Sequence, residues 1–168
     1  MKPVPLSFST ATDADAASLA GLRSSTADHL TELHGRGHWS APVSEAGVLR
    51  AMESCRVLVG RNRGRIVGML ALATKKPWAI DTKYFARVER ALYLHDMAVA
   101  PRMQGRGIGR RMLEAATEMA RSWPAQAIRL DAYDAEAGAG AFYARCGYTE
   151  VGRVTYRKVA LIYYELLL

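Results

Sequence analysis

Residues 94–109, LHDMAVAPRMQGRGIG, combine an apolar run, a proline and three glycines at every second position. The run Ala91–Val99 predicts a β-strand, which Pro101 ends. Gly107–Ser122 predicts a helix, because its apolar residues recur at helical spacing. The glycine-rich segment Gln104–Gly109 therefore connects a strand to the start of a helix.

This connection is suited to bind phosphate. The first N–H groups of a helix lack intrahelical acceptors and carry positive partial charge. Glycines leave such amides accessible to an anion, and four arginines surround the turn: Arg102, Arg106, Arg110 and Arg111. The alternative is that the glycines only permit a tight connection and the arginines are solvated. The strand end, the cations and the amphipathic helix together favour an anion site.

Two familiar phosphate motifs do not fit this turn. A P-loop ends in Gly-Lys-Ser/Thr, which is absent here. The Rossmann fingerprint needs a third glycine three positions after the second, followed by an acidic residue on a later strand. Gly105, Gly107 and Gly109 have a different interval, and the turn comes late in the chain.

Composition indicates one globular domain over residues 1–168, with a formal net charge of +7. Such a charge favours anionic ligands, either nucleic acid or a polyphosphorylated cofactor. Two cysteines, Cys55 and Cys146, fit a reducing compartment better than a disulfide framework. No segment resembles a signal peptide, and no apolar run is long enough to span a bilayer. We therefore expect a cytoplasmic protein without a membrane segment.

The remaining elements alternate between short strands and helices. The expected strands are Pro3–Thr10, Arg56–Gly60, Arg65–Ala73, Gln126–Ala132, Tyr148–Arg153 and Val159–Leu167, and the expected helices are Asp13–Ser24, Ser44–Ser54 and Ala137–Arg145. Segments 25–43 and 75–90 show no clear pattern. The order β-α-α-β-β-β-α-β-α-β-β predicts an α/β fold with a mixed central β-sheet flanked by helices.

Two segments together resemble a known family. Residues 94–109 resemble the central signature of the GNAT superfamily of N-acetyltransferases, a strand ending near Val and Pro and then Arg/Gln-x-x-Gly-x-Gly/Ala. Residues 141–148, AFYARCGY, resemble its second signature, a Phe-Tyr pair before Gly-Phe or Gly-Tyr. The element order also matches, except in segments 25–43 and 75–90. The resemblance implies a GNAT-type fold and an acetyl-CoA-dependent N-acetyltransferase.

The resemblance also implies where the cofactor lies. Backbone amides of the turn would hold the CoA pyrophosphate, and the preceding strand would pair with the pantetheine arm. One strand amide would polarise the thioester carbonyl. The implied cofactor-binding residues are Met97, Ala98, Val99, Gln104, Gly105, Arg106, Gly107, Ile108, Gly109 and Arg110. The amine would attack directly in a ternary complex, without a nucleophilic side chain.

Proton transfer needs a donor and an acceptor. Tyr143 matches the family's usual donor to the departing thiolate, and its alternative role is a buried aromatic anchor. His95 and Asp96 are the candidate bases, and neighbouring strand residues point to opposite faces. His95 is slightly favoured, because polyamine-type relatives carry a glutamate at the matching position. A core histidine and a water relay remain open, and Glu136 departs from the asparagine that often contacts the cofactor.

The acceptor would lie near the two segments outside the resemblance. Trp39, Trp78 and Tyr84 are the candidate acceptor-binding residues, although buried aromatic anchors are an equal alternative. His29, His34 and His38 do not form a convincing metal site, because glycines interrupt any helix that would align them. No metal is expected.

A primary amine of a small molecule is the expected acceptor, with a protein N-terminus or lysine as the alternative. A non-catalytic acyl-CoA-binding module is a further alternative. A nucleic-acid-binding domain would need a continuous basic helix or interleaved aromatic residues on a basic surface, and neither is seen. A homodimer through the apolar last strand is possible, but core burial explains that strand equally well.

Overall fold

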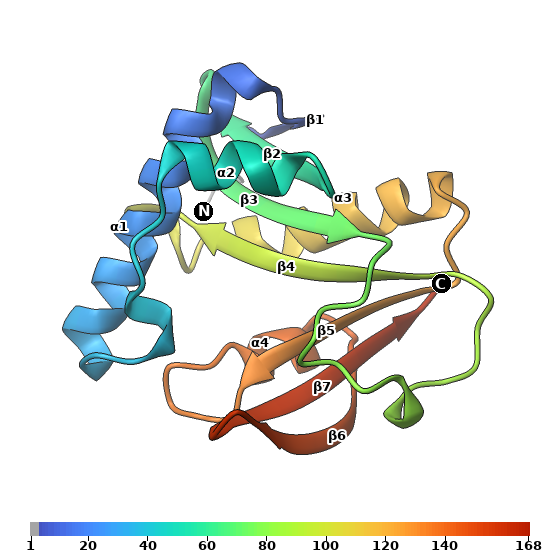
Figure 1. Cartoon of the computed structure of the whole chain (residues 1–168). Coiled ribbons are helices and arrows are strands. Elements are labelled where there is room, and N and C mark those ends of the chain that lie inside the picture. The colour runs from blue at the N-terminus through green and yellow to red at the C-terminus, as the bar shows by residue number, and fades with distance from the viewer. Residues whose placement is uncertain (1–3) are drawn as a thin grey trace. The chain divides into compact units, whose positions relative to one another are not determined.

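The structure is a computed structural model that describes residues 4–168, and the chain forms two compact units (Figure 1). The first contains the chain up to Leu72 together with Asp96–Ala116. The second contains Ala73–His95 and Thr117–Leu168. The seven strands have the order β1-β2-β3-β4-β5-β7-β6 and helices accompany them, which confirms the predicted mixed α/β fold. A single domain over residues 1–168 stays a prediction.

The elements follow the predicted order. The strands are β1 (Ser7–Thr10), β2 (Arg56–Asn62), β3 (Arg65–Ala73), β4 (Ala91–Val99), β5 (Ala127–Tyr133), β6 (Thr149–Tyr156) and β7 (Val159–Leu167). The helices are α1 (Ala16–His34), α2 (Glu45–Met52), α3 (Ile108–Ser122) and α4 (Gly140–Arg145). Short 3₁₀ turns are η1 (Asp13–Asp15), η2 (His38–Ser40), η3 (Thr82–Tyr84) and η4 (Pro101–Met103). β4 and α3 contribute residues to both units.

Helix α1 starts later and runs ten residues further than predicted. The expected cap Asp13 belongs to η1, and α1 begins at Ala16. Beyond Ser24 the sequence is polar, but Thr26 and Thr31 donate their hydroxyl protons to carbonyls one turn back, at 2.9 and 2.8 Å. These bonds stay within the helix and let polar residues continue it. The irregular segment expected over 25–43 is therefore half helix.

Other boundaries move by a few residues. α4 begins at Gly140 rather than Ala137, because Gly138 donates to the Ala135 carbonyl in a turn (2.8 Å). β6 extends to Tyr156 and β2 to Asn62. β1 begins at Ser7, since Pro5 has no N–H for a strand ladder. Pro3, the expected start of β1, lies outside the described residues.

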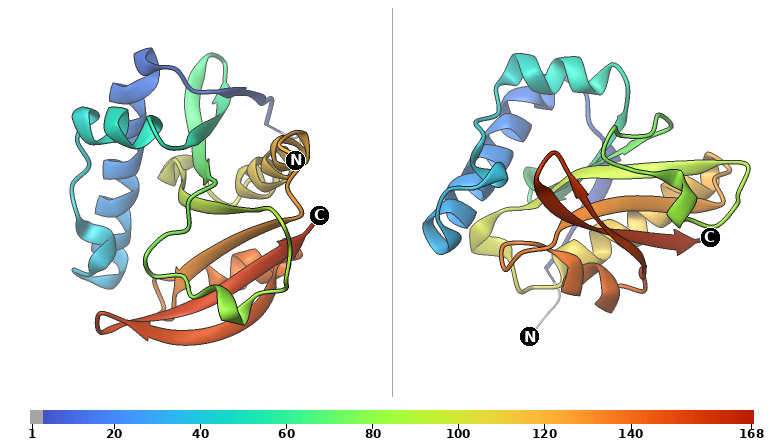
Figure 2. Two further views of the ribbon diagram at one scale, coloured as in Figure 1. Left: turned by 45° about the vertical axis from the view of Figure 1, so that its right-hand side comes forward. Right: turned by 60° about the horizontal axis from the view of Figure 1, so that its bottom comes forward.

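In the first unit, helices pack on both faces of β2 and β3 (Figure 2). One face buries Val59 and Met69 against α1 and α2. On the other face, Gly60 lies so close to Met112 of α3 that an added Cβ would be 2.7 Å from its sulfur. A missing side chain on β2 thus lets the N-terminal turns of α3 approach the sheet.

In the second unit, β7 lies between β5 and β6 and is buried on both faces. Tyr164 packs against Tyr143 of α4. Tyr163 packs with Ile80 and Phe85, which belong to the segment that follows β3. Core burial therefore accounts for the apolar last strand.

A buried ion pair connects the segment after β3 to strands β5 and β7. Arg129 of β5 and Glu165 of β7 are directly opposite each other, with Nε and Oε2 2.9 Å apart. Arg129 also donates to the Ala86 carbonyl (2.6 Å), and Glu165 accepts the Ala86 N–H (3.0 Å). The guanidinium lies 4.9 Å from the centre of the Phe85 ring. Both charges are thus compensated by partners in the same unit.

Arg129→Met should lower the free energy of unfolding by about 3–5 kcal/mol, because it leaves the buried Glu165 charge without its partner. Urea unfolding at pH 7 measures this loss. The double variant Arg129→Met/Glu165→Met removes both charges and should recover most of the stability. A loss below about 1 kcal/mol in the single variant, as for an exposed pair, would contradict this role.

Candidate functional site

The glycine-rich turn follows the end of β4 in the first unit. The Gln104 side chain donates to the Val99 carbonyl (3.1 Å), and the Met103 N–H donates to the Ala100 carbonyl (2.7 Å). Gln104 therefore has a visible local role, which is to fix how the chain leaves the strand.

Gly105 and Gly107 adopt left-handed backbone conformations, with φ of 71° and 75°. Such angles favour glycine over any residue with a Cβ. Apart from the glycine itself and its two chain neighbours, no heavy atom of residues 4–168 lies within 4 Å of the position that a Cβ would take at either glycine. The turn thus leaves open space above its backbone, as a bound anion requires.

The start of α3 offers N–H groups to that space. The helical bond that closes the first turn runs from the Arg111 N–H to the Gly107 carbonyl (3.2 Å). The amides of Ile108 and Gly109 precede it, so they have no intrahelical acceptor. The positive end of the helix dipole adds to the attraction for phosphate.

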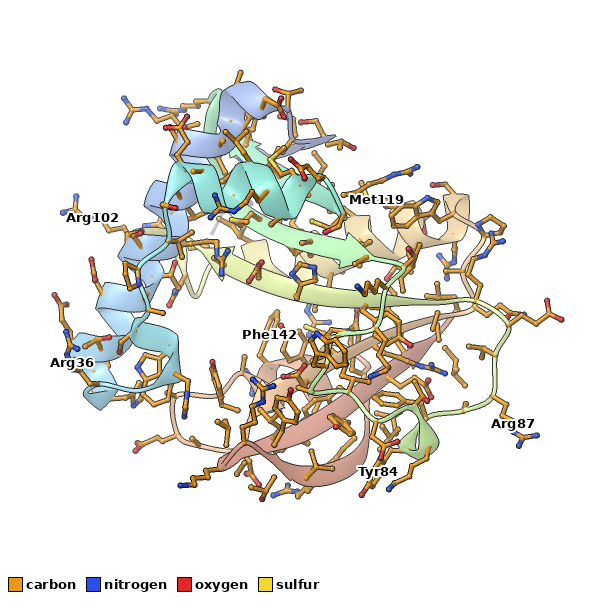
Figure 3. All side chains as sticks on the ribbon, viewed as in Figure 1. Arg36, Tyr84, Arg87, Arg102, Met119 and Phe142 are labelled. Carbon is orange, nitrogen blue, oxygen red and sulfur yellow. The ribbon has the colours of Figure 1, made fainter. Side chains whose placement is uncertain are left out.

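The four arginines at the turn have different surroundings. Arg102, Arg106 and Arg110 are exposed, and Arg102 extends away from the ribbon (Figure 3). Arg111 instead donates to the Val4 carbonyl (2.6 Å) and lies 5.8 Å from the centre of the Phe8 ring. Arg111 therefore holds the N-terminal segment rather than a ligand.

Asp96 interrupts β4. Its φ of 53° is left-handed, which asparagine and aspartate tolerate better than most residues. Its carboxylate lies 2.7 Å from the Arg23 guanidinium of α1. Accepting a proton would weaken that ion pair, so Asp96 is the poorer of the two predicted bases.

Asp131 is a functional candidate that was missed from the sequence. It lies on β5 in the second unit, opposite Tyr163 of β7. Burial raises the pKa of the Asp131 carboxyl, while a hydrogen bond from its own backbone and the charge of His95 act in the opposite direction. The charge of His95 therefore acts on the Asp131 carboxyl. The signal was present: Arg129 and Asp131 are charged residues at alternate positions of an otherwise apolar strand.

Tyr143 lies on α4 in the second unit and is buried, with 7% of its surface exposed. Its ring packs against Tyr148 and Tyr164, with centroids 5.7 and 6.1 Å away. Burial raises the pKa of the Tyr143 phenol, and the charges of Asp131 and Cys146 raise it further. The phenol therefore carries its proton at neutral pH.

The predicted acceptor residues have different surroundings. In the first unit, Trp39 donates its indole N–H to the Gly35 carbonyl (3.1 Å), and its ring covers Gly37. In the second unit, Trp78 is 84% exposed, and Tyr84, labelled in Figure 3, packs edge-on against Tyr163. Trp78 and Tyr84 line a cavity of about 590 Å³.

Residues 4–168 contain neither a membrane-spanning helix nor a cluster of metal-binding side chains. No helix there combines the length and the apolar character needed to cross a bilayer. No three His, Cys, Asp or Glu side chains in this range gather as a metal ion would require.

A comparison with known protein families identifies the family to which this chain belongs. The profile of the Acetyltransferase (GNAT) family matches residues 25–148, which include both the glycine turn and Tyr143. The chain belongs to the GNAT acetyltransferase family. This GNAT protein is thus an acyltransferase, and acetyl-CoA is its co-substrate.

Solved structures share the GNAT fold at low sequence identity. The ribosomal-protein-alanine N-acetyltransferase of Brucella melitensis is 21% identical with a TM-score of 0.74, over 96% of this chain and 99% of that one. YncA of Salmonella typhimurium, solved with its cofactor acetyl-CoA, is 20% identical with a TM-score of 0.71, over 97% and 94%. A GCN5-related N-acetyltransferase of Rhodopseudomonas palustris is 19% identical with a TM-score of 0.73, over 100% and 99%. Among curated protein sequences, none matches significantly.

Proposed function

We propose that this GNAT enzyme transfers the acetyl group of acetyl-CoA to a primary amine of a small molecule, by direct attack in a ternary complex. The observation that carries the proposal is the turn at the start of α3. It combines left-handed glycines, open space and unpaired helix amides. Direct attack needs no nucleophilic side chain, so the protein has only to bind, orient and move protons.

Acetyl-CoA supplies the acetyl group as a thioester. The proposed pyrophosphate ligands are the residues of the turn: Gln104, Gly105, Arg106, Gly107, Ile108, Gly109 and Arg110. The strand residues Met97, Ala98 and Val99 would follow the pantetheine arm. A backbone N–H fixed in that strand would stabilise negative charge developing on the thioester oxygen.

The acceptor amine must lose a proton. An alkylamine has a pKa of about 10, so it is mostly protonated at pH 7. We assign the proton acceptor to His95 assisted by Asp131, because the two interact electrostatically in the second unit. Asp96 is the second candidate for the proton acceptor, because its carboxylate forms an ion pair with Arg23.

Asp131→Asn should lower kcat/KM at pH 7 by about tenfold or more, since the proton acceptor loses its charged partner. The loss should shrink by pH 9, where a larger fraction of the amine is already deprotonated. Initial rates of CoA release between pH 6 and 9.5 measure both effects. A deficit that stays constant across this range would contradict a role in proton transfer.

The acceptor pocket is assigned to the second unit, where Trp78 and Tyr84 line the cavity. Trp39 of the first unit stays a separate candidate for acceptor binding. A protein amine is the second candidate acceptor, because the Brucella structure is that of a ribosomal-protein-alanine N-acetyltransferase. We place the enzyme in the cytoplasm, because two cysteines are too few to form a disulfide framework.

Calorimetric titration with acetyl-CoA, free CoA and longer acyl-CoAs tests the cofactor assignment. Binding at micromolar concentration is the expected result. A panel of amines then tests the acceptor by thiol release, with peptides bearing free N-termini as the second arm. Absence of binding by the folded protein would overturn the proposed site, and release with peptides alone would move the acceptor to proteins.

A further inference from the structure

The turn between β6 and β7 has an unusual sequence for its geometry. Arg157 and Lys158 form a two-residue connection between the paired residues Tyr156 and Val159. Both are left-handed, with φ of 47° and 68°. This hairpin geometry prefers Asn-Gly, because residues with long side chains are strained there.

The first unit contains a matched hairpin with a more usual sequence. Arg63 and Gly64 connect Asn62 to Arg65 with φ of 49° and 80°. Glycine thus occupies the second position in one hairpin, whereas Lys158 occupies it in the other. Strained positions of this kind are often found at functional sites. The Arg157–Lys158 turn is therefore a candidate for a binding role.

The strained turn adjoins the cavity of about 590 Å³ in the second unit. Its walls combine aromatic side chains with polar ones. The aromatic residues are Trp78, Tyr84, Tyr156 and Tyr163, and the polar ones include Lys76, Asp81 and Thr155. We call this cavity the Trp78 groove. The Arg157 guanidinium lies 5.3 Å from the centre of the Tyr156 ring, so a cation is held at its rim.

The charges around the groove do not cancel these cations. Asp81 is the one carboxylate among its described lining residues, and it is bound by Lys83 at 3.0 Å. Lys76 donates to the Ile80 carbonyl (2.7 Å). Two carboxylates elsewhere in the second unit, Glu150 of β6 and Asp134 after β5, are bound by Arg153 at 2.7 and 3.3 Å. Arg157 and Lys158 are exposed, and the rim has a positive excess.

We propose that the Trp78 groove binds an acceptor that is both aromatic and anionic, with its ring between Trp78 and Tyr156 and its carboxylate on the Arg157–Lys158 turn. This rests on the proposed function, since the acceptor amine is the ligand that the groove would take. The acceptor class is then an aromatic amine that carries a carboxylate, such as an aromatic amino acid. Aromatic walls bind the ring, and charge-assisted hydrogen bonds from the turn select the anion.

A substitution that relieves the strain also removes the cations. Arg157→Asn/Lys158→Gly installs the sequence that the turn geometry prefers. We expect the melting temperature to rise by about 2–4 °C, while recognition of the carboxylate is lost. Arg63→Asn is the matched control, because it completes the same Asn-Gly pair in the hairpin of the first unit, whose residues do not line the groove.

Binding is measured without acetyl transfer. The probes are 3-phenylpropionate and its uncharged amide, 3-phenylpropanamide, and the readout is the indole N–H resonance of Trp78, assigned with Trp78→Phe. The unsubstituted protein and Arg63→Asn should bind the carboxylate about tenfold more tightly than the amide. The double variant should bind both probes equally. Equal binding by the unsubstituted protein, or a preference that survives in the double variant, would overturn the inference.

A second arm separates this inference from the proposed function. Rates of CoA release are compared for L-phenylalanine and 2-phenylethylamine, which differ in the carboxylate. A higher kcat/KM for L-phenylalanine that disappears in the double variant supports the inference. Turnover of both amines at equal efficiency overturns the inference and leaves the proposed function intact. If no amine in any panel releases CoA, the proposed function fails, and the probe titration alone then decides whether the groove binds carboxylates.

Discussion

Gly107→Glu is expected to weaken acetyl-CoA binding by at least about a hundredfold, which corresponds to roughly 2.7 kcal/mol. Gly107 has φ of 75° and open space at its Cβ position, so the new side chain would enter the region assigned to the pyrophosphate. The left-handed backbone costs a residue with a Cβ about 1–2 kcal/mol. A carboxylate about 4 Å from a phosphate adds roughly 4 kcal/mol of repulsion near a protein surface. The strain is shared by the free and the bound protein, so this repulsion alone accounts for the expected loss of affinity.

Gly64→Glu is the control for this variant. Gly64 has φ of 80° and nothing within 4 Å of its Cβ position, but it lies in the hairpin between β2 and β3. It therefore introduces the same charge with similar backbone strain elsewhere in the same unit. Calorimetry should give unchanged acetyl-CoA affinity for Gly64→Glu and no measurable binding for Gly107→Glu, with both proteins folded by circular dichroism. Tight binding by Gly107→Glu would mean that the cofactor site lies elsewhere.

Tyr143→Phe is expected to lower kcat by about 10²–10³-fold, the range that general acid catalysis usually supplies. The change removes one hydroxyl and little volume, so the acetyl-CoA dissociation constant should stay the same. Burial holds the pKa of the Tyr143 phenol well above neutrality, and the phenol therefore retains the proton that the departing thiolate needs. Steady-state rates at saturating acetyl-CoA, compared with calorimetric affinity, separate the two quantities.

Tyr148→Phe provides the matched comparison. Tyr148 is buried beside Tyr143, and its hydroxyl has no hydrogen-bond partner among residues 4–168. Removing that hydroxyl should change neither kcat nor affinity, because no bond is broken. An equal loss of turnover in both variants would point to damage of the aromatic cluster. Full activity of Tyr143→Phe would remove Tyr143 as the acid.

The two experiments report on different units of the molecule. Gly107 belongs to the first unit and is tested by binding, whereas Tyr143 belongs to the second and is tested by turnover. If both experiments give the expected results, co-substrate binding is assigned to the first unit and proton donation to the second.

The sequence by itself determined the order of elements and the position of the glycine-rich turn. Both depend on local chemistry: strand and helix periodicity, Pro101 at the end of β4, and glycines at the start of α3. Residues 94–109 carry this information within one short segment, so their geometry follows from near neighbours. The predicted β4, Ala91–Val99, has the same bounds in the structure.

Only the tertiary structure decided which charged side chains meet. Arg129 and Glu165 are 36 residues apart, and the pairing of β5 with β7 brings them together. Asp131 is a functional candidate because burial raises the pKa of its carboxyl and the charge of His95 acts on it. Asp96 is the weaker candidate base, because its carboxylate forms an ion pair with Arg23 of α1. The extent of α1 beyond Ser24 was also missed, since hydroxyl bonds within the helix offset its polar composition. Burial and long-range pairing depend on the whole fold, and no local window of sequence contains them.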